Sequence, residues 1–189
     1  IRLFGFIEGF DIGDVEAFYE AKKTYKDNKV AVFLTGVGAY LMAQLRQRGA
    51  EAIVCAMSGN FVQRGEPALV HKLARAEMAV DCGADLVLEL PTPWAMATAE
   101  TFAMGGVQLL HMAGCSHIAF GSECGDAALL QKTADILLLP QFQADILAEL
   151  ASGVTYAAAR QRATERYQSH SAAVLSRPHD TLAGEYLKA

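Results

Sequence analysis

The chain has 189 residues, which is long enough to bury a substantial hydrophobic core. Hydrophobic residues make up 52% of it and charged residues 20%, a composition typical of a globular protein rather than a disordered one. The formal net charge of −5 argues against an electrostatic grip on nucleic acid along the whole chain, but is compatible with a local basic patch. No apolar run reaches membrane-spanning length and no signal peptide is evident, so we expect no membrane partner.

The cysteines and histidines are scattered. The four cysteines form no Cys-x-x-Cys pair, which argues against both a zinc site and a disulfide framework. The five histidines form no His-x-x-His pair, and we expect no metal site built by the protein itself. Reduced thiols in turn predict a cytoplasmic protein.

Apolar runs and helical patterns alternate along the first two thirds of the chain. In order, they predict a strand at 3–7, a helix at 14–25, a strand at 30–34, a helix at 39–48, a strand at 52–56, a helix from near Pro67 to Gly83, a strand at 85–90, a helix at 95–112 and a strand at 117–120. Strands separated by helices predict an α/β fold with a doubly wound parallel sheet.

Two of these helices carry more detailed expectations. The helix that begins near Pro67 should bury an apolar face made of Leu69, Leu73, Ala76 and Val80. In the helix at 95–112, the pair Gly105-Gly106 should weaken the middle or end the helix early.

Strand patterns disappear after Gly125. Helices are predicted at 126–139, 141–151 and 155–167, so we expect a Rossmann-like nucleotide-binding domain at 1–125 and a helical extension at 126–189. Arg160, Arg162 and Arg166 make the last of these helices locally basic. With Glu165 among them, a solvated face is favoured over contact with a nucleic-acid backbone.

Residues 57–68, here called the signature loop, join a buried strand to a helix. Open α/β sheets bind their ligands beyond the carboxyl ends of such strands. The loop has glycines and hydrogen-bond donors suited to phosphate or acetate oxygens. Its candidate binding residues are Ser58, Gly59, Asn60, Gln63 and Arg64. An ordinary polar connection remains an equal alternative.

Two other loops are weaker candidates. Residues 35–38 (Thr-Gly-Val-Gly) resemble half of a dinucleotide fingerprint, and Thr35, Gly36 and Gly38 would form an N-terminal binding loop. The third glycine is missing, because Leu41 takes its place, so a nicotinamide-dependent oxidoreductase is a minor alternative. The loop at 121–123 (Gly-Ser-Glu) would let a nucleotide approach closely, but such a loop is more often a simple turn.

Several motifs follow one another in a fixed order: the signature loop and residues 76–79 (Ala-Glu-Met-Ala), 83–91 (Gly-Ala-Asp-Leu-Val-Leu-Glu-Leu-Pro) and 120–123 (Phe-Gly-Ser-Glu). In this order they resemble the bacterial tRNA(Met) cytidine acetate ligase family. Residues 175–186 resemble a later family motif that ends in Glu-Tyr. The resemblance covers about residues 39–189, roughly the first half of a typical family chain.

The resemblance implies a nucleotidyltransferase-like Rossmann fold and an ATP-dependent ligase. Such enzymes activate acetate as acetyl-adenylate and acetylate N4 of the wobble cytidine of elongator tRNA(Met). ATP is then a substrate, with Mg²⁺ as its candidate companion, and acetate and tRNA(Met) are the partners. By position, Gly121 matches an ATP-contacting glycine, and His179 stands where the family has an ATP-contacting asparagine. No catalytic residue is assigned.

The first 38 residues depart from the family pattern. Family members open with a strand that runs into an Asn-Pro-Phe-His-x-Gly-His loop, whose histidines face the ATP phosphates. Here either 35–38 or 8–11 takes that place, and neither segment contains histidine. The alternative function is therefore a catalytically inactive nucleotide- or RNA-binding relative, or a fragment.

Overall fold

The central sheet is parallel. The computed structural model describes residues 29–33, 39–63 and 65–189, so the strand expected at 3–7 and the helix expected at 14–25 lie outside the described residues. Four strands in the order β3-β2-β1-β4 form the sheet, and every neighbouring pair is parallel. They are β1 (Lys29–Phe33), β2 (Ala52–Ser58), β3 (Leu86–Leu90) and β4 (His117–Ala119).

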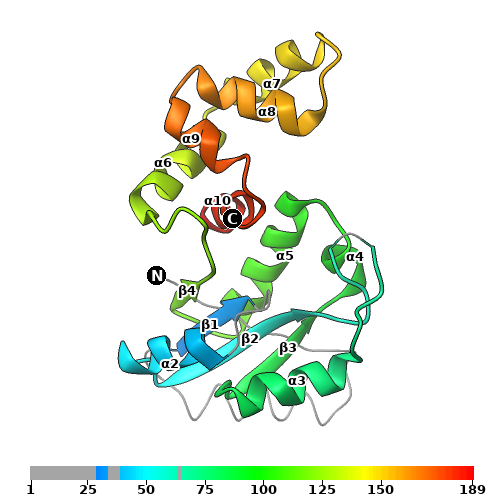
Figure 1. Ribbon diagram of the computed structural model, residues 1–189, viewed down its shortest axis with the longest axis vertical. Helices are drawn as coiled ribbons and strands as arrows, with labels where there is room; N and C mark the ends of the chain where they lie inside the picture. Colours follow the sequence, from blue (N-terminus) through cyan, green and yellow to red (C-terminus); the bar gives the residue numbers. More distant parts are fainter. Residues whose placement is uncertain (1–28, 34–38, 64) are drawn as a thin grey trace. The chain divides into compact units, whose positions relative to one another are not determined.

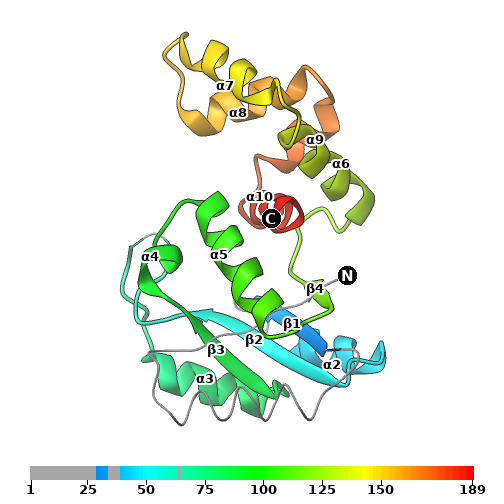
Figure 2. The same ribbon diagram turned by 180° about the vertical axis from the view of Figure 1, so that it is seen from behind.

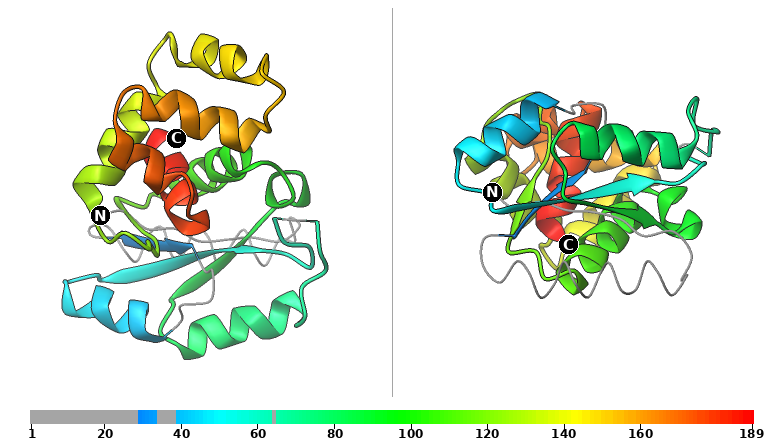
Figure 3. Two further views of the ribbon diagram at one scale, coloured as in Figure 1. Left: turned by 45° about the horizontal axis from the view of Figure 1, so that its top comes forward. Right: turned by 90° about the horizontal axis from the view of Figure 1, so that it is seen from below.

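Helices cover both faces of this sheet (Figures 1 and 3). On one face lie α2 (Ala39–Gln47) and α3 (Lys72–Asp81), and on the other lies α5 (Ala99–Met112). The same arrangement is visible from behind in Figure 2. Strand β2 is buried from Ala52 to Met57, as expected for a central parallel strand that is covered on both faces. The predicted α/β fold with a doubly wound parallel sheet is confirmed.

Helix α3 begins later than predicted. Pro67 does not enter its first turn, because it pairs with Phe61 in an isolated antiparallel bridge. The helix starts at Lys72, and the His71 side chain accepts a hydrogen bond from the Leu73 amide at 3.3 Å. The signature loop thus folds back on itself, and it includes Pro67, where the sequence predicted the helix to begin.

The apolar face predicted for α3 is also wrong. Leu69 precedes the helix and is fully exposed. Leu73 and Val80 are exposed, and only Ala79 of this helix is buried. Arg75 of this helix donates hydrogen bonds to the carboxyl end of β2.

The helix expected at 95–112 is two helices. A short helix, α4 (Thr92–Ala95), precedes α5, which begins after Thr98, whose hydroxyl oxygen accepts a hydrogen bond from the Thr101 amide. Gly105 and Gly106 neither break nor end α5 but lie buried within it. A Cβ on Gly105 would overlap the Trp94 side chain, whose own Cβ would lie at 2.9 Å. The glycine therefore lets the indole pack directly against α5.

Residues Gly121–Ala189 form a second compact unit made of helices. The three predicted helices are confirmed, and two that follow them were not predicted. All five are α6 (Ala127–Leu137), α7 (Phe142–Leu150), α8 (Tyr156–Glu165), α9 (Ser169–Val174) and α10 (Pro178–Lys188). The core that joins α6, α7 and α8 contains Leu137, Phe142, Ile146, Ala159 and Ala163. Across the described ranges, no helix is long and apolar enough to span a bilayer.

Because Gly105 packs against Trp94, a methyl group added at residue 105 should change the free energy of unfolding in the opposite direction to one added at residue 184. Gly105→Ala should destabilise the protein by about 1–3 kcal/mol, because the new Cβ has no space beside Trp94. Gly184→Ala is the matched control, since Gly184 is also helical and a Cβ there would meet nothing within 4 Å of the described atoms. It should stabilise by up to about 1 kcal/mol. Urea unfolding followed by circular dichroism would measure both, and equal shifts would contradict this packing.

Candidate functional site

The carboxyl ends of the four parallel strands lie at one edge of the sheet. The signature loop leaves this edge from β2, and Gly121 follows the last residue of β4 by two positions. Thr35, Gly36 and Gly38 belong to the connection between β1 and α2, and they lie outside the described residues, as does Arg64.

The signature loop is a small closed hairpin rather than an open connection. The Val62 amide donates to the Glu66 carbonyl at 2.9 Å, and the Ala68 amide donates to the Asn60 carbonyl at the same distance. Gly65 turns the chain with a positive φ of 75°, and its amide donates to the Val62 carbonyl. Gln63 is half-buried near this turn. The described residues of the loop therefore present a hydrogen-bonded backbone at the edge of the sheet.

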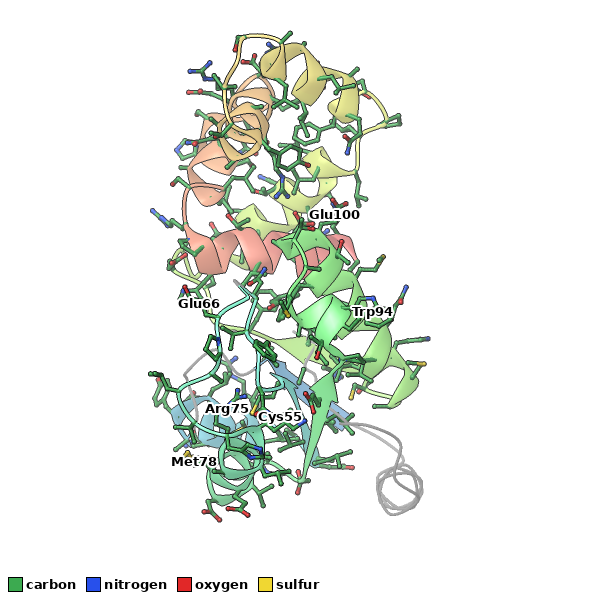
Figure 4. The ribbon with its side chains drawn as sticks, turned by 90° about the vertical axis from the view of Figure 1, so that its right-hand side faces the viewer. Cys55, Glu66, Arg75, Met78, Trp94 and Glu100 are labelled. Atoms are coloured by element: carbon green, nitrogen blue, oxygen red, sulfur yellow. The ribbon has the colours of Figure 1, made fainter. Side chains whose placement is uncertain are left out.

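Arg75 of α3 binds the point where β2 becomes the loop. Its Nη2 donates hydrogen bonds to the Ser58 carbonyl at 2.9 Å and to the Gly59 carbonyl, while its Nε donates to the Val70 carbonyl at 3.0 Å. In Figure 4 Arg75 lies near the base of the loop and Glu66 lies farther along it. Burial lowers the pKa of the Arg75 guanidinium and the nearby Glu89 carboxylate opposes this, so the group stays charged.

A mostly buried ion pair lies beside this contact. Lys72 Nζ is 3.1 Å from Glu89 Oε2, and the two side chains are only 16% and 12% exposed. Glu89 comes from β3, next to β2, and a Cβ on Gly59 would overlap its carboxylate. Position 59 therefore accepts only glycine while Glu89 holds this orientation.

Asn60 stabilises the start of α3. Its side-chain oxygen accepts a hydrogen bond from the Lys72 amide at 3.2 Å, which satisfies one of the donors that helix starts leave unpaired. The structure thus brings Ser58, Gly59 and Asn60 together, and it gives Asn60 a structural contact in addition to its predicted ligand role.

The second cluster surrounds Asp180 within the helical unit. The Asp180 carboxylate is fully buried and accepts hydrogen bonds from the Ser122 hydroxyl at 2.6 Å, from the Glu123 amide at 2.8 Å and from the Cys124 amide at 3.1 Å. The loop that contains Gly121 is therefore fastened to the first turn of α10 by one carboxylate.

Glu123 returns this contact. One carboxylate oxygen accepts a hydrogen bond from the Asp180 amide at 3.1 Å, and the other lies 3.2 Å from His179 Nδ1. Gly121 and His179, the two predicted ATP contacts, therefore lie on segments that are hydrogen-bonded to each other. A Cβ on Gly121 would meet none of the described atoms within 4 Å, so packing does not explain a glycine there.

The hydrogen bonds also lower the pKa of the Asp180 carboxyl group. Burial alone raises the pKa of its carboxyl group, but the hydrogen bonds from Ser122, Cys124 and Glu123 outweigh burial and leave the pKa below its ordinary value. Asp180 is therefore a charged structural acceptor near neutral pH and no reservoir of protons for catalysis.

The arginines of α8 are paired with carboxylates. Arg160 forms an ion pair with the buried Glu185. Arg166 pairs with Glu149, and Arg162 lies 3.9 Å from the same carboxylate. Arg162 and Arg166 are about half exposed, in keeping with the solvated face that the sequence favoured. The prediction is wrong for Arg160, whose side chain is mostly buried against Glu185. Within the ranges that the structure describes, no three His, Cys, Asp or Glu side chains come together as a metal site.

Comparison with known proteins identifies the family. A family model described as HIGH nucleotidyl transferase matches residues 38–189. The chain belongs to this family. The match begins at residue 38, the last residue of the segment 35–38, and so close to the point where the resemblance to the ligases begins.

Curated relatives and a solved structure agree with this membership. A tRNA(Met) cytidine acetate ligase of Acetivibrio thermocellus is 47% identical over 147 residues, covering 75% of this chain and 35% of the relative. One from Syntrophotalea carbinolica is 44% identical, covering 79% and 37%. Thermotoga maritima TmcAL, solved with alpha-thio ATP, superposes with a TM-score of 0.72 at 36% identity, covering 79% of this chain and 39% of that one. The predicted resemblance is confirmed, and the chain spans well under half the length of these relatives.

Sequence reasoning missed the charged groups that hold both loops. Lys72 and Arg75 are three residues apart, a spacing that places both cations on one side of a helix. Glu89 is a charged residue inside an apolar strand, which is a signal for a buried partner. Asp180 offered no comparable signal, because Ser122, Glu123 and Cys124, which donate hydrogen bonds to it, lie more than fifty residues earlier in the chain.

Replacing Asp180 should reveal a pH-dependent contribution to stability. Asp180→Asn should cost about 1–3 kcal/mol at pH 7, since the amide cannot replace the charged acceptor. A lowered folded-state pKa stabilises the fold above the unfolded-state value of about 3.9, and this stabilisation is lost as the pH falls through the folded-state pKa. Urea unfolding at pH 7 and pH 3 should show the difference from the unmodified chain narrowing at the lower pH.

Asp135→Asn provides the control, because Asp135 is exposed on α6 and only bonds the neighbouring Gln131 side chain. It should change stability little at either pH. An equal loss for the two variants would contradict the role assigned to Asp180.

Proposed function

We propose that this chain is the nucleotide-binding part of an ATP-dependent ligase that activates acetate as acetyl-adenylate and acetylates N4 of the wobble cytidine of elongator tRNA(Met). The observation that carries the proposal is the signature loop at the carboxyl edge of a parallel sheet, in a chain similar to T. maritima TmcAL, whose structure contains alpha-thio ATP. The names of the curated relatives supply the acceptor, tRNA(Met), and the acyl donor, acetate.

The chemistry fits the properties of this edge. Formation of an acetyl-adenylate releases pyrophosphate, so negative charge builds on the leaving phosphates and must be met by fixed donors. The ordered backbone of the signature loop, with Ser58, Gly59, Asn60, Gln63 and Arg64, is proposed to supply them. Acetate must be held near the α-phosphorus, which requires a rigid pocket rather than a mobile loop.

Gly121 and His179 are proposed to contact ATP. A glycine that the fold itself does not require is suited to a position where a ligand comes close. The His179 side chain is half exposed, and while its Nδ1 faces Glu123, its Nε2 can donate to a nucleotide as the family's asparagine would. Mg²⁺ would be held through the phosphate oxygens of ATP.

A second candidate function is a nucleotide- or tRNA-binding relative without catalysis. The specific observation that favours it is the absence of histidine from residues 34–38, which connect β1 to the first helix of the family match. Such a protein would bind ATP without forming pyrophosphate when acetate is added.

Isothermal titration with ATP and an acetate-dependent pyrophosphate exchange assay separate these functions. The ligase predicts ATP binding together with exchange that requires acetate. Binding without exchange supports the inactive relative. Absence of both in a folded chain contradicts the proposal.

Gly121→Ala makes the first measurement specific to the site. The added methyl fits the fold, so the unfolding midpoint should stay unchanged, whereas ATP affinity should fall about tenfold, as expected when a methyl group occupies the space of a ligand. Asp135→Asn is again the matched surface control and should leave the affinity unchanged. An unaltered ATP affinity in Gly121→Ala would remove Gly121 from the site.

A further inference from the structure

We propose that Arg75 is a positioning residue that makes the signature loop able to accept an anion, because Nη2 of its guanidinium holds the Ser58 and Gly59 carbonyl oxygens while Nε holds the Val70 carbonyl oxygen. This inference rests on the proposed function, because the anion in question is the phosphate chain of ATP. Arg75 itself does not contact the nucleotide in this account.

The carbonyl oxygens at the end of β2 would oppose the binding of an anion. A peptide carbonyl carries partial negative charge and repels phosphate, whereas the amides of the same backbone attract it. Arg75 Nη2 bonds both carbonyls at the end of β2, and its Nε fixes the Val70 carbonyl just before α3. One planar group therefore fixes the direction of two successive peptide units and neutralises the oxygens that would oppose an anion.

The surrounding charges favour the same outcome. Lys72 and Arg75 both lie beside Glu89, so two cationic side chains lie at the base of the loop. Glu89 also fills the space where position 59 would carry a side chain, which keeps the backbone close to the cluster. The base of the loop thus combines a fixed backbone with cationic side chains in a partly buried setting, where charges are screened less than at the surface.

Arg46 at the opposite edge provides a matched comparison within the same sheet. Its guanidinium donates to the Ala50 carbonyl at 3.0 Å, to the Glu51 carbonyl at 2.7 Å and to the Asp85 carboxylate at 2.5 Å. It fastens the amino ends of β2 and β3 with the same chemistry, but far from the edge where ligands of such sheets bind. Loss of Arg46 should therefore cost stability without affecting ATP.

The test compares Arg75→Met, Arg75→Lys and Arg46→Met in the chain. Isothermal titration measures ATP affinity, and hydrogen–deuterium exchange measures protection of the amides in residues 59–68. Both Arg75 variants should bind ATP about tenfold more weakly, because a lysine keeps the charge but has no second nitrogen in a planar group to hold the Val70 carbonyl together with the end of β2. Both should also increase exchange in the loop. Arg46→Met should increase exchange near residues 50–53 and keep the ATP affinity of the unmodified chain.

The three variants separate a positioning role of Arg75 from general destabilisation and from a simple effect of charge. Equal loss of affinity in Arg75→Met and Arg46→Met would overturn the positioning role, since general destabilisation would then explain both. Full affinity in Arg75→Lys would overturn it too, because charge alone would be enough. If the unmodified chain binds no ATP, the proposed function fails. The role of Arg75 in ATP binding then fails as well. Separately, unchanged amide exchange in the loop of Arg75→Met would show that Arg75 does not hold the Ser58 and Gly59 carbonyls.

Discussion

The architecture of the sheet domain depends on fixing both ends of one buried strand. Strand β2 is central and almost entirely apolar, so its side chains hold it in the core but do not determine where the chain leaves it. Charged groups determine this: Arg46 and Asp85 at the amino end, and Arg75 at the carboxyl end. Because the polar contacts lie at the ends and the apolar contacts lie between them, the loop after β2 starts from a defined position.

In the helical unit a loop is also held by a charged side chain, but there the charge is negative. There a buried carboxylate, Asp180, gathers the amides and the hydroxyl of the loop after β4, and Glu123 accepts a hydrogen bond from the start of α10 in return. In both units a loop at a strand end is held by one charged side chain that bonds to several backbone groups. In this arrangement a single charged side chain forms hydrogen bonds with several backbone groups, each of which would cost free energy if it were buried unpaired.

The periodicity of the sequence was sufficient for the parallel sheet and most of the helices, because those depend on local apolar patterns. It failed where polar contacts between distant segments override local preference. Pro67 would suit a first helical turn, but its pairing with Phe61 delays α3 until Lys72. Gly105 looked like a helix breaker, but it makes room for Trp94. The candidate loops could be located from motifs, whereas Arg75 and Asp180, which hold them, depend on contacts that only the folded chain shows.

The signature loop at the end of β2 is the proposed binding site for the phosphates of ATP. The most direct measurement is a titration of the isotopically labelled chain with ATP, followed by the chemical shifts of its backbone amides. This proposal predicts saturable shifts concentrated at residues 58–63. Saturable shifts confined to other segments, or no shifts at millimolar ATP, would contradict it.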